Sequence, residues 1–405
     1  MSQMQISNKV ASIPEALSIY INNIVYTMRQ ADYPIKVLSL GEAYFKIPLL
    51  SFDNIDFEKG YHYTESRGIY DLREKIAKYY SKNYDVSVDP RDEILISAGS
   101  KPLIYMAFQA VLNPGDEVLI HEPAWLSYPE EIKLADGVPS FIPYNCPVEE
   151  FENYFTEKTR MIVINNPNNP AGRTYTREEL ETLYEICRPR GIYILVDEAY
   201  SDFITDESFV SMANVVPTKD GIIVVNSLSK NFGISGWRIG YVISTPEIIY
   251  NILKLNQHLI TCAPSILLLY LNEHFDELLA LTLPQAQAVV EKRNQVNQYA
   301  KSIGLRALPG SATFYLFFDI SDYGRSSLDF AMFLLAKYHI AVVPGSAYGA
   351  STDHFIRVGV GTETVDDLKA CLDTINSVIK TKEFDDGIID AELAKLNLDR
   401  FIANE

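Results

Sequence analysis

The chain has 405 residues, of which 47% are hydrophobic and 22% charged, a composition typical of a globular protein. Because this length exceeds what one ordinary core needs, we expect two domains. The formal net charge of −18 disfavours nucleic acid as a partner, since an acidic surface repels a phosphate backbone.

Targeting and metal-binding patterns are also missing from the sequence. No apolar run approaches the roughly 20 residues of a membrane-spanning helix, so we expect no membrane association. The first residues lack a basic stretch followed by an apolar core, and the four cysteines are scattered singly. These features favour a cytoplasmic protein without disulfides. The six histidines lack ligand-like spacing, so no metal site is expected.

Between about residues 94 and 245, short apolar runs alternate with helix-like segments. The predicted strands are 94–97, 117–121, 160–165, 191–196, 221–225 and 238–244, and the intervening helices include 102–112, 126–134 and 177–188. Buried strands separated by helices indicate an α/β domain with a mostly parallel wound sheet flanked by helices.

From about residue 285 the pattern changes to that of a smaller α+β domain. A polar helix over 285–303 is followed by strands at 314–320, 339–343 and 355–359. We therefore expect a large domain over 46–285 and a small domain from 1–45 with 286–380. Residues 381–405 would form a C-terminal extension with a peripheral helix.

Two segments that follow predicted strands carry polar residues. The turn at 97–102 opens a helix, and its backbone amides could cradle a phosphate group or serve only as a helix cap. The segment 165–172 is rich in asparagine and proline. It is either a tight turn or a support for an asparagine side chain that bonds a planar ligand.

Two further segments carry ionisable groups. Asp197 ends an apolar strand, which is costly unless the carboxylate meets a cation or a donor. It could keep a pyridine nitrogen protonated, bind a metal or cap a helix. Lys230 lies among small hydroxyl residues and glycines, with Arg238 eight residues later. This lysine is either solvated or a nucleophile suited to holding a phosphorylated aldehyde as a Schiff base.

In this order and spacing, the four segments resemble the class I pyridoxal-phosphate aminotransferases of fold type I, similar to aspartate aminotransferase. The resemblance runs from about residue 38 to residue 372. Further matching segments are 61–73, 122–128, 309–315, 344–345 and 355–358. It implies a fold of one large cofactor-binding domain and one smaller domain, with pyridoxal 5′-phosphate as the cofactor.

The resemblance also implies a role for each matching residue. Lys230 would form the Schiff base and then carry a proton between the substrate Cα and the cofactor, and Asp197 would face the pyridine nitrogen. The other matches are Tyr200 and Asn169 at the phenolic oxygen, Trp125 on the ring, Gly99, Ser100, Lys101, Ser227 and Arg238 at the phosphate, and Arg357, Asn169 and Gly41 at the substrate carboxylate. Tyr63 matches a tyrosine that reaches the neighbouring subunit's cofactor, which implies a homodimer with shared active sites.

The implied activity is a ping-pong exchange of an amino group between an L-amino acid and a 2-oxo acid. Lys101 occupies the place of a lysine that binds a distal carboxylate in one subgroup, which favours aspartate or glutamate as a substrate. Another subgroup uses an arginine within 251–265, and this chain has none there. The alternative is C–S lyase or other Cα/Cβ chemistry on the same scaffold. A non-catalytic ligand-sensing homologue is the remote alternative.

Overall fold

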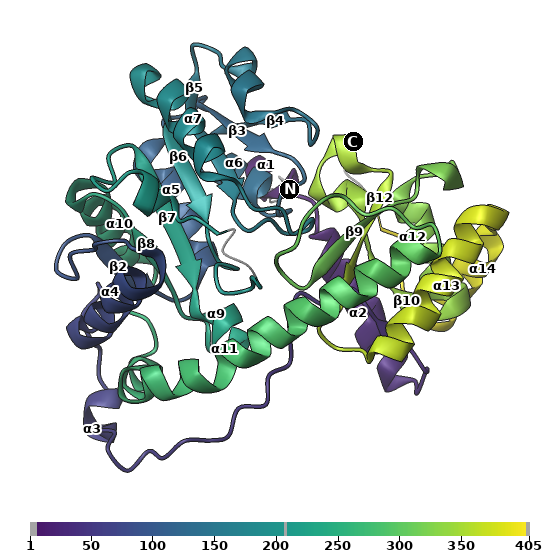
Figure 1. Cartoon of the computed structure of the whole chain (residues 1–405), viewed down its shortest axis with the longest axis horizontal. Coiled ribbons are helices and arrows are strands. Elements are labelled where there is room, and N and C mark those ends of the chain that lie inside the picture. Colours follow the sequence, from purple (N-terminus) through teal and green to yellow (C-terminus); the bar gives the residue numbers. More distant parts are fainter. Residues whose placement is uncertain (1–5, 206–208, 402–405) are drawn as a thin grey trace, which may run out of the picture.

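A seven-stranded sheet forms the centre of the larger part of the molecule (Figure 1). The computed structural model describes residues 6–205 and 209–401. In spatial order the strands are β2 (Ile94–Ser97), β8 (Gly240–Ile243), β7 (Ile222–Ser227), β6 (Tyr193–Asp197), β5 (Thr159–Asn165), β3 (Glu117–His121) and β4 (Val138–Ile142). Strand β8 is antiparallel to both of its neighbours, and the other pairs are parallel. The predicted, mostly parallel α/β sheet is therefore confirmed.

Strand β4 is the one member of this sheet that the sequence pattern did not predict. It lies at the edge of the sheet, where Val138 and Phe141 are exposed and Pro139 interrupts the apolar pattern. An edge strand tolerates proline and needs no continuous hydrophobic run, so its sequence resembles that of a loop.

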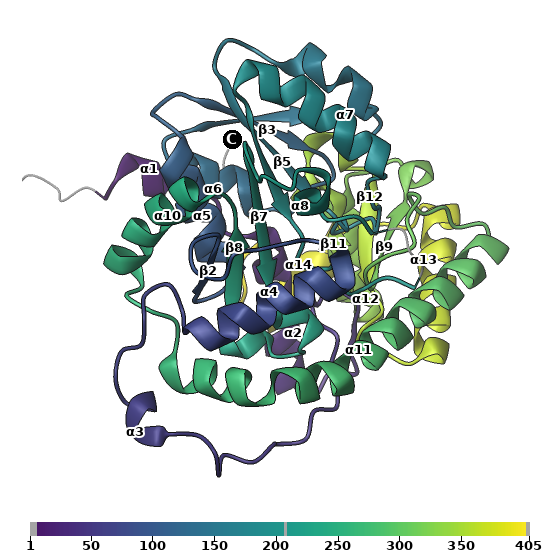
Figure 2. The ribbon, with the colours of Figure 1, turned by 60° about the vertical axis from the view of Figure 1, so that its left-hand side comes forward.

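Helices cover both faces of the sheet because successive strand residues point to opposite sides. In β7, Ile222 and Val224 pack into one core, whereas Ile223 and Val225 pack into the other. The first core is closed by α4 (Tyr70–Tyr84), α7 (Arg177–Cys187), α8 (Met212–Val215) and α11 (Ser265–Ser302). The second is closed by α5 (Ser100–Val111), α6 (Tyr128–Leu134) and α10 (Pro246–Leu259). Figure 2 shows the sheet between these two layers.

The smaller part combines both ends of the chain around a third core. Its strands are β9 (Tyr315–Asp319), β11 (Val343–Pro344) and β12 (Phe355–Gly359) in one antiparallel sheet, with β1 (Lys36–Val37) paired to β10 (Ile340–Ala341). The helices are α2 (Leu17–Gln30), α12 (Ser327–Tyr338), α13 (Val365–Thr381) and α14 (Asp386–Lys395). Ile389 and Leu393 of α14 join this core, so the last described helix packs against the small part.

Helix α11 connects the two parts, and the domain boundary proposed at 285/286 falls within it. The helix begins at Ser265, twenty residues before the predicted start at 285. It contains Pro284 and a non-helical residue, His274. A proline often marks a first helical turn, which makes a start near 285 the natural prediction.

The remaining helices are short. They are α1 (Asn8–Ala11), α3 (Phe57–Gly60) and α9 (Leu228–Asn231). Within residues 6–205 and 209–401, no helix is both long and apolar enough to cross a membrane.

Candidate active site

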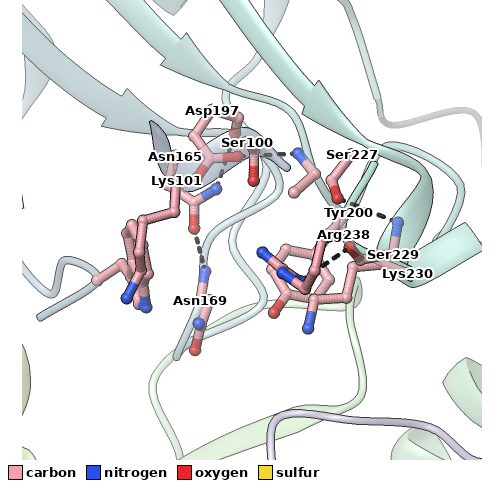
Figure 3. A pocket seen from close by; sticks show the side chains of 12 residues that line it. Ser100, Lys101, Asn165, Asn169, Asp197, Tyr200, Ser227, Ser229, Lys230 and Arg238 are labelled. Carbon is pink, nitrogen blue, oxygen red and sulfur yellow. Dashed lines mark hydrogen bonds between the residues drawn. The ribbon is translucent and has the colours of Figure 1, made fainter. Parts of the chain in front are cut away.

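A pocket opens at the carboxyl edge of the large sheet, where open α/β sheets place their ligands (Figure 3). It is lined by Ser100, Lys101, Trp125, Asn165, Asn169, Asp197, Ala199, Tyr200, Ser227, Ser229, Lys230 and Arg238. Nine of the predicted site residues are thus brought together from segments far apart in the chain.

The antiparallel direction of β8 explains how Arg238 reaches this edge. Ser97 of β2 and Ser227 of β7 both pair with Gly240 at the start of β8. The residue two positions before Gly240 therefore lies beside the ends of the parallel strands. Arg238 adopts a left-handed conformation (φ 58°), which costs a non-glycine residue about 1–2 kcal/mol. Its Nη1 donates to the Ser235 carbonyl oxygen (2.7 Å).

Glycine is required where the turn before α5 meets Arg238. A Cβ atom on Gly99 would lie 2.7 Å from the Arg238 guanidinium, and Gly99 has a φ of 98°. A Cβ on Gly240 would collide with the backbone nitrogen of Ser100. The first amides of α5 and the guanidinium are therefore held close together. With the hydroxyls of Ser227 and Ser229, they form a set of donors suited to a phosphate group.

Lys230 lies in α9, immediately after β7, and its Nζ donates to the Gly41 carbonyl oxygen (2.7 Å). Burial lowers the pKa of Lys230 to about 8, and the positive charges of Arg357 and Arg238 act in the same direction. Glu42 and Asp197 partly oppose the shift. About a tenth of this amine is therefore neutral at pH 7, far more than for an ordinary lysine, and the neutral form is the one that a nucleophile or a proton acceptor requires.

Asp197 is buried at the end of β6 and accepts hydrogen bonds from the Tyr128 hydroxyl (2.7 Å) and the Ala199 amide (3.0 Å). Burial raises the pKa of this carboxyl, and these bonds and Lys230 only partly offset the shift. A cation placed beside Asp197 would be stabilised strongly, because water does not screen the charge there.

Asn165 connects Asp197 to the other wall of the pocket. Its Nδ2 donates to the Asp197 carbonyl oxygen (2.8 Å), and its Oδ1 accepts from the Asn169 amide (2.6 Å). The Asn169 side-chain oxygen in turn accepts from Arg357 Nη1 (3.1 Å). A chain of buried hydrogen bonds therefore fixes the loop after β5.

Arg357, in the middle of β12, is a buried cation without a carboxylate partner in the described part of the chain. Its Nη2 donates to the Ser39 carbonyl oxygen (2.6 Å), and its Nε has no partner. The guanidinium stacks over the Tyr315 ring, 4.4 Å from the centroid. Such a group binds a carboxylate well, because arginine presents two parallel donors.

Tyr200 and Trp125 supply the aromatic surfaces of the pocket. The Tyr200 hydroxyl lies 2.9 Å from the Tyr315 hydroxyl, and the Lys230 amine lies 5.8 Å from the Tyr200 ring centroid. Trp125 lies under the Lys101 amine, which is 4.7 Å from its ring centroid. Figure 3 places Lys101 and Lys230 on opposite sides of the pocket.

Tyr63 is the predicted site residue that the structure leaves apart from this pocket. Its side chain is 85% exposed, and it lines a separate cavity beside α3 with residues such as Lys59 and Glu65. The prediction assigned it to the site of a neighbouring subunit, so its distance from Lys230 within one chain is expected.

Several residues of the site escaped the sequence analysis. Asn165, Ala199 and Ser229 line the pocket. Tyr128 donates a hydrogen bond to Asp197, and the Tyr315 hydroxyl bonds the Tyr200 hydroxyl. The position of Asn165 at the end of a predicted strand was the only available signal for this group. Tyr128 and Tyr315 gain their roles from contacts between distant segments, which no local pattern reveals.

The residues present fit a planar, phosphorylated aldehyde. Lys230 provides an amine for the aldehyde, Asp197 a buried carboxylate for a ring nitrogen, and the Arg238 region donors for a phosphate. Arg357 remains available for a second anion, such as a substrate carboxylate. Lys230, Asp197 and Arg238 line one cavity, and Arg357 bonds Asn169 of the same lining, so the four groups can act on one amino acid.

Comparison with known proteins agrees with this chemistry. The family model "Aminotransferase class I and II" matches residues 51–375. The chain is 31% identical over 389 residues to an aspartate aminotransferase of Thermotoga maritima, covering 93% of this chain and 100% of that protein. It is 29% identical over 377 residues to aromatic-amino-acid aminotransferase 2 of Thermococcus litoralis, covering 89% and 95%.

The fold is also that of solved aminotransferase structures. An aspartate aminotransferase from Thermus thermophilus with maleate superimposes with a TM-score of 0.83 at 26% sequence identity, covering 93% of this chain and all of the other. An aspartate aminotransferase of Thermotoga maritima gives a TM-score of 0.81 at 29% identity and the same coverage.

Proposed function

Because this chain belongs to the aminotransferase class I and II family and is an aminotransferase, we propose that Lys230 is its central catalytic group. The reaction exchanges an amino group between an L-amino acid and a 2-oxo acid in two half-reactions. The observation that carries the proposal is the partly buried Lys230 amine, which lines the pocket and has a pKa lowered to about 8, chiefly by desolvation. Such an amine can both attack a carbonyl group and accept a proton near neutral pH.

The proposed cofactor is pyridoxal 5′-phosphate, which supplies a reactive aldehyde and an electron-withdrawing ring. Arg238, Ser227, Ser229 and the amides of Ser100 and Lys101 would hold its phosphate. Trp125 would stack on the ring, and Tyr200 and Asn169 would bond its phenolic oxygen. Asp197 would stabilise a proton on the ring nitrogen, and the burial that raises the pKa of this carboxyl supports the pairing, because a cation beside it would be poorly screened.

Lys230 would move a proton at the substrate Cα, and Arg357 would bind the α-carboxylate. The unpartnered Nε of Arg357 and its position beside Asn169 support the second role. Gly41 belongs to the same side, since its carbonyl oxygen already accepts a bond from Lys230. A substrate held by Arg357 would have its Cα directed towards the Lys230 amine, which is the orientation that proton transfer requires.

A homodimer is the proposed assembly, with Tyr63 of each copy reaching the phosphate in the site of the other. Large apolar or aromatic side chains of the segment around α3 are exposed in a single copy: Leu49, Phe57, Tyr61 and Tyr63. Figure 1 shows this segment as an extended loop beside the large domain. An exposed group of this kind is typical of a surface that another chain covers.

We also propose a cytoplasmic location. All four cysteines are free, and three of them are buried. Free buried thiols are typical of proteins that stay in a reducing compartment.

An acidic amino acid, aspartate or glutamate, is the proposed substrate in one half-reaction. The position of Lys101 across the pocket from Lys230 supports this, as does the name of the Thermotoga relative. The name of the Thermococcus relative supports an aromatic side chain in the same pocket for the other half-reaction.

A two-stage assay tests the proposed reaction. The enzyme loaded with pyridoxal phosphate is mixed with one amino acid, and the absorbance of the cofactor, the 2-oxo acid and ammonia are measured. We expect one equivalent of 2-oxo acid per site and no ammonia, with turnover only after a second 2-oxo acid is added. Continuous ammonia release from the amino acid alone would instead identify a lyase.

A further inference from the structure

Glu131 is a buried carboxyl on the wall of the active-site region to which the mechanism above gives no role. The residue is only 7% exposed, and its Oε2 has no hydrogen-bond partner in the described part of the chain. It lies in α6, one turn after Tyr128, whose hydroxyl donates to Asp197. Residues three apart share a helix face, so α6 directs both groups towards the same region.

Lys101 is the positive charge that acts most strongly on Glu131. Its amine lies over the Trp125 ring, and that ring packs edge-on against Tyr128 at 5.3 Å between centroids. Burial raises the pKa of Glu131, and the charge of Lys101 is the strongest influence that lowers it again. Burial likewise lowers the pKa of Lys101, and Glu131 is the charge that most opposes this. The two side chains therefore act mainly on each other.

Other charges around α6 are already matched or point elsewhere. Asp197 of β6 also raises the pKa of Glu131, and Arg238 acts on Lys101. The remaining titratable groups of neighbouring elements have partners of their own: Glu130 with Lys133, Lys9 of α1 with Asp136, Tyr105 of α5 with Gln109, Glu117 of β3 with Ser140, and His121 of β3 with Tyr175. Strand β4 carries no titratable side chain.

The geometry points to Glu131 as a specificity-determining residue, the internal counter-ion of Lys101 at the side-chain end of the pocket. This inference rests on the aminotransferase function proposed above. When the pocket holds an uncharged side chain, Glu131 balances the charge of Lys101. When it holds a dicarboxylate, the second carboxylate of the substrate competes with Glu131 for the same amine. One pocket then serves the two different substrates of the two half-reactions.

This arrangement has a consequence for protons. A substrate carboxylate at Lys101 brings a second negative charge near Glu131, and like charges favour the protonated form of one of them. Burial raises the pKa of Glu131 to about 8, so above that pH, where the carboxyl is ionised, it then takes up a proton from solvent. A substrate with an uncharged side chain leaves the protonation state of Glu131 unchanged. Dicarboxylate binding should therefore be coupled to proton uptake, whereas binding of a monocarboxylate with an apolar side chain should not.

The test compares Glu131→Gln with Glu130→Gln, which changes a neighbouring carboxyl of the same helix that pairs with Lys133 at the surface. Each holoenzyme is titrated with maleate and with 3-phenylpropionate by calorimetry at about pH 8.5, above the raised pKa of Glu131, in two buffers that differ in ionisation enthalpy. We expect proton uptake with maleate in the wild type and in Glu130→Gln, and none in Glu131→Gln. The ratio of kcat/KM for glutamate over phenylalanine should rise roughly tenfold in Glu131→Gln.

A second pair of variants tests whether Glu131 acts through Lys101. In a Lys101→Met background, Glu131→Gln should leave the substrate ratio unchanged, because no amine remains to be balanced. An unchanged ratio or unchanged proton uptake in Glu131→Gln alone would overturn the inference, and so would an equal effect in both backgrounds. If no pair of amino acid and 2-oxo acid is transaminated by the wild type, the proposed function fails instead.

Discussion

The two ends of the active-site pocket are held in different ways. Around Lys230, buried hydrogen bonds through Asn165, Asn169 and Arg357 connect β5, β6 and β12 to Ser39, which lies just after β1. Around Lys101, the amine lies over the Trp125 ring, and the buried Glu131 carboxyl acts on it through its charge.

This difference separates reaction type from substrate choice. Groups that handle the substrate Cα and carboxylate must be fixed to a fraction of an ångström, and buried hydrogen bonds do this. Groups that contact a variable side chain must accept more than one partner. The Lys230 end therefore determines the chemistry, and the Lys101 end determines which amino acids undergo it.

The largest effect is expected at the fixed end, from Lys230→Ala. Loss of the amine removes the group that moves the proton, so kcat should fall about 10⁴-fold. The phosphate contacts should still retain cofactor, which absorbance of the dialysed protein would detect. Lys78→Ala, at an exposed lysine paired with Glu74, is the control and should keep full activity. Wild-type turnover by Lys230→Ala would remove the basis of the mechanism.

Asp197→Asn should have the second-largest effect, a fall in kcat of about 10²–10³-fold. A neutral amide stabilises a protonated ring nitrogen far less than a carboxylate does. Tyr128→Phe is a matched variant that removes one hydrogen bond to Asp197 and keeps its charge. If kcat falls less in Tyr128→Phe than in Asp197→Asn in the same steady-state assay, the effect of Asp197 is due to its charge. Equal losses in both variants would assign it to position.

Arg357→Lys should act mainly on KM. The ammonium keeps the charge but loses one of two parallel donors, and a hydrogen bond to a charged group contributes about 1.5–3 kcal/mol, or roughly 10- to 100-fold. The KM of every amino acid should rise by a similar factor, since all share the α-carboxylate. A rise confined to dicarboxylates would place Arg357 at the other end of the pocket.

The pH dependence of cofactor capture measures the Lys230 amine directly. Only the neutral amine attacks an aldehyde, and burial lowers the pKa of Lys230 to about 8 from an ordinary 10.5. The rate at which apoprotein takes up pyridoxal phosphate should rise about tenfold per pH unit below pH 8 and level off above it. A rate that continues to rise towards pH 10 would show an unperturbed lysine.

Tyr63→Phe should have the smallest effect, a few-fold faster loss of cofactor on dilution, because the proposed bond is one of several to the phosphate and the other donors remain. Sedimentation should show a dimer in both proteins. Tyr26→Phe, at another exposed tyrosine, serves as the control. A monomeric wild type that holds its cofactor equally well would leave Tyr63 without this role.

The sequence was most informative where function depends on local order along the chain. Buried strands ending in Asp197 or leading into Lys230 produce a pattern that can be read without coordinates. Edge strand β4 and the early part of α11 were missed, because exposure and an internal proline mask their patterns. Tyr128 and Glu131 were also missed as functional groups, since their importance arises only when α6 packs beside Asp197 and Lys101.

Helix α11 also has a mechanical consequence. Pro284 lacks an N–H group, so the helix loses one backbone bond between the two cores. Nearby side chains supply other donors to its carbonyl groups, with Thr282 Oγ1 bonded to the Leu278 oxygen and Gln285 Nε2 to the Leu281 oxygen, both at 2.9 Å. Helix α11 is therefore most easily bent at the turn that contains Pro284. Bending there would tilt the wall that carries Arg357 against the wall that carries Lys230.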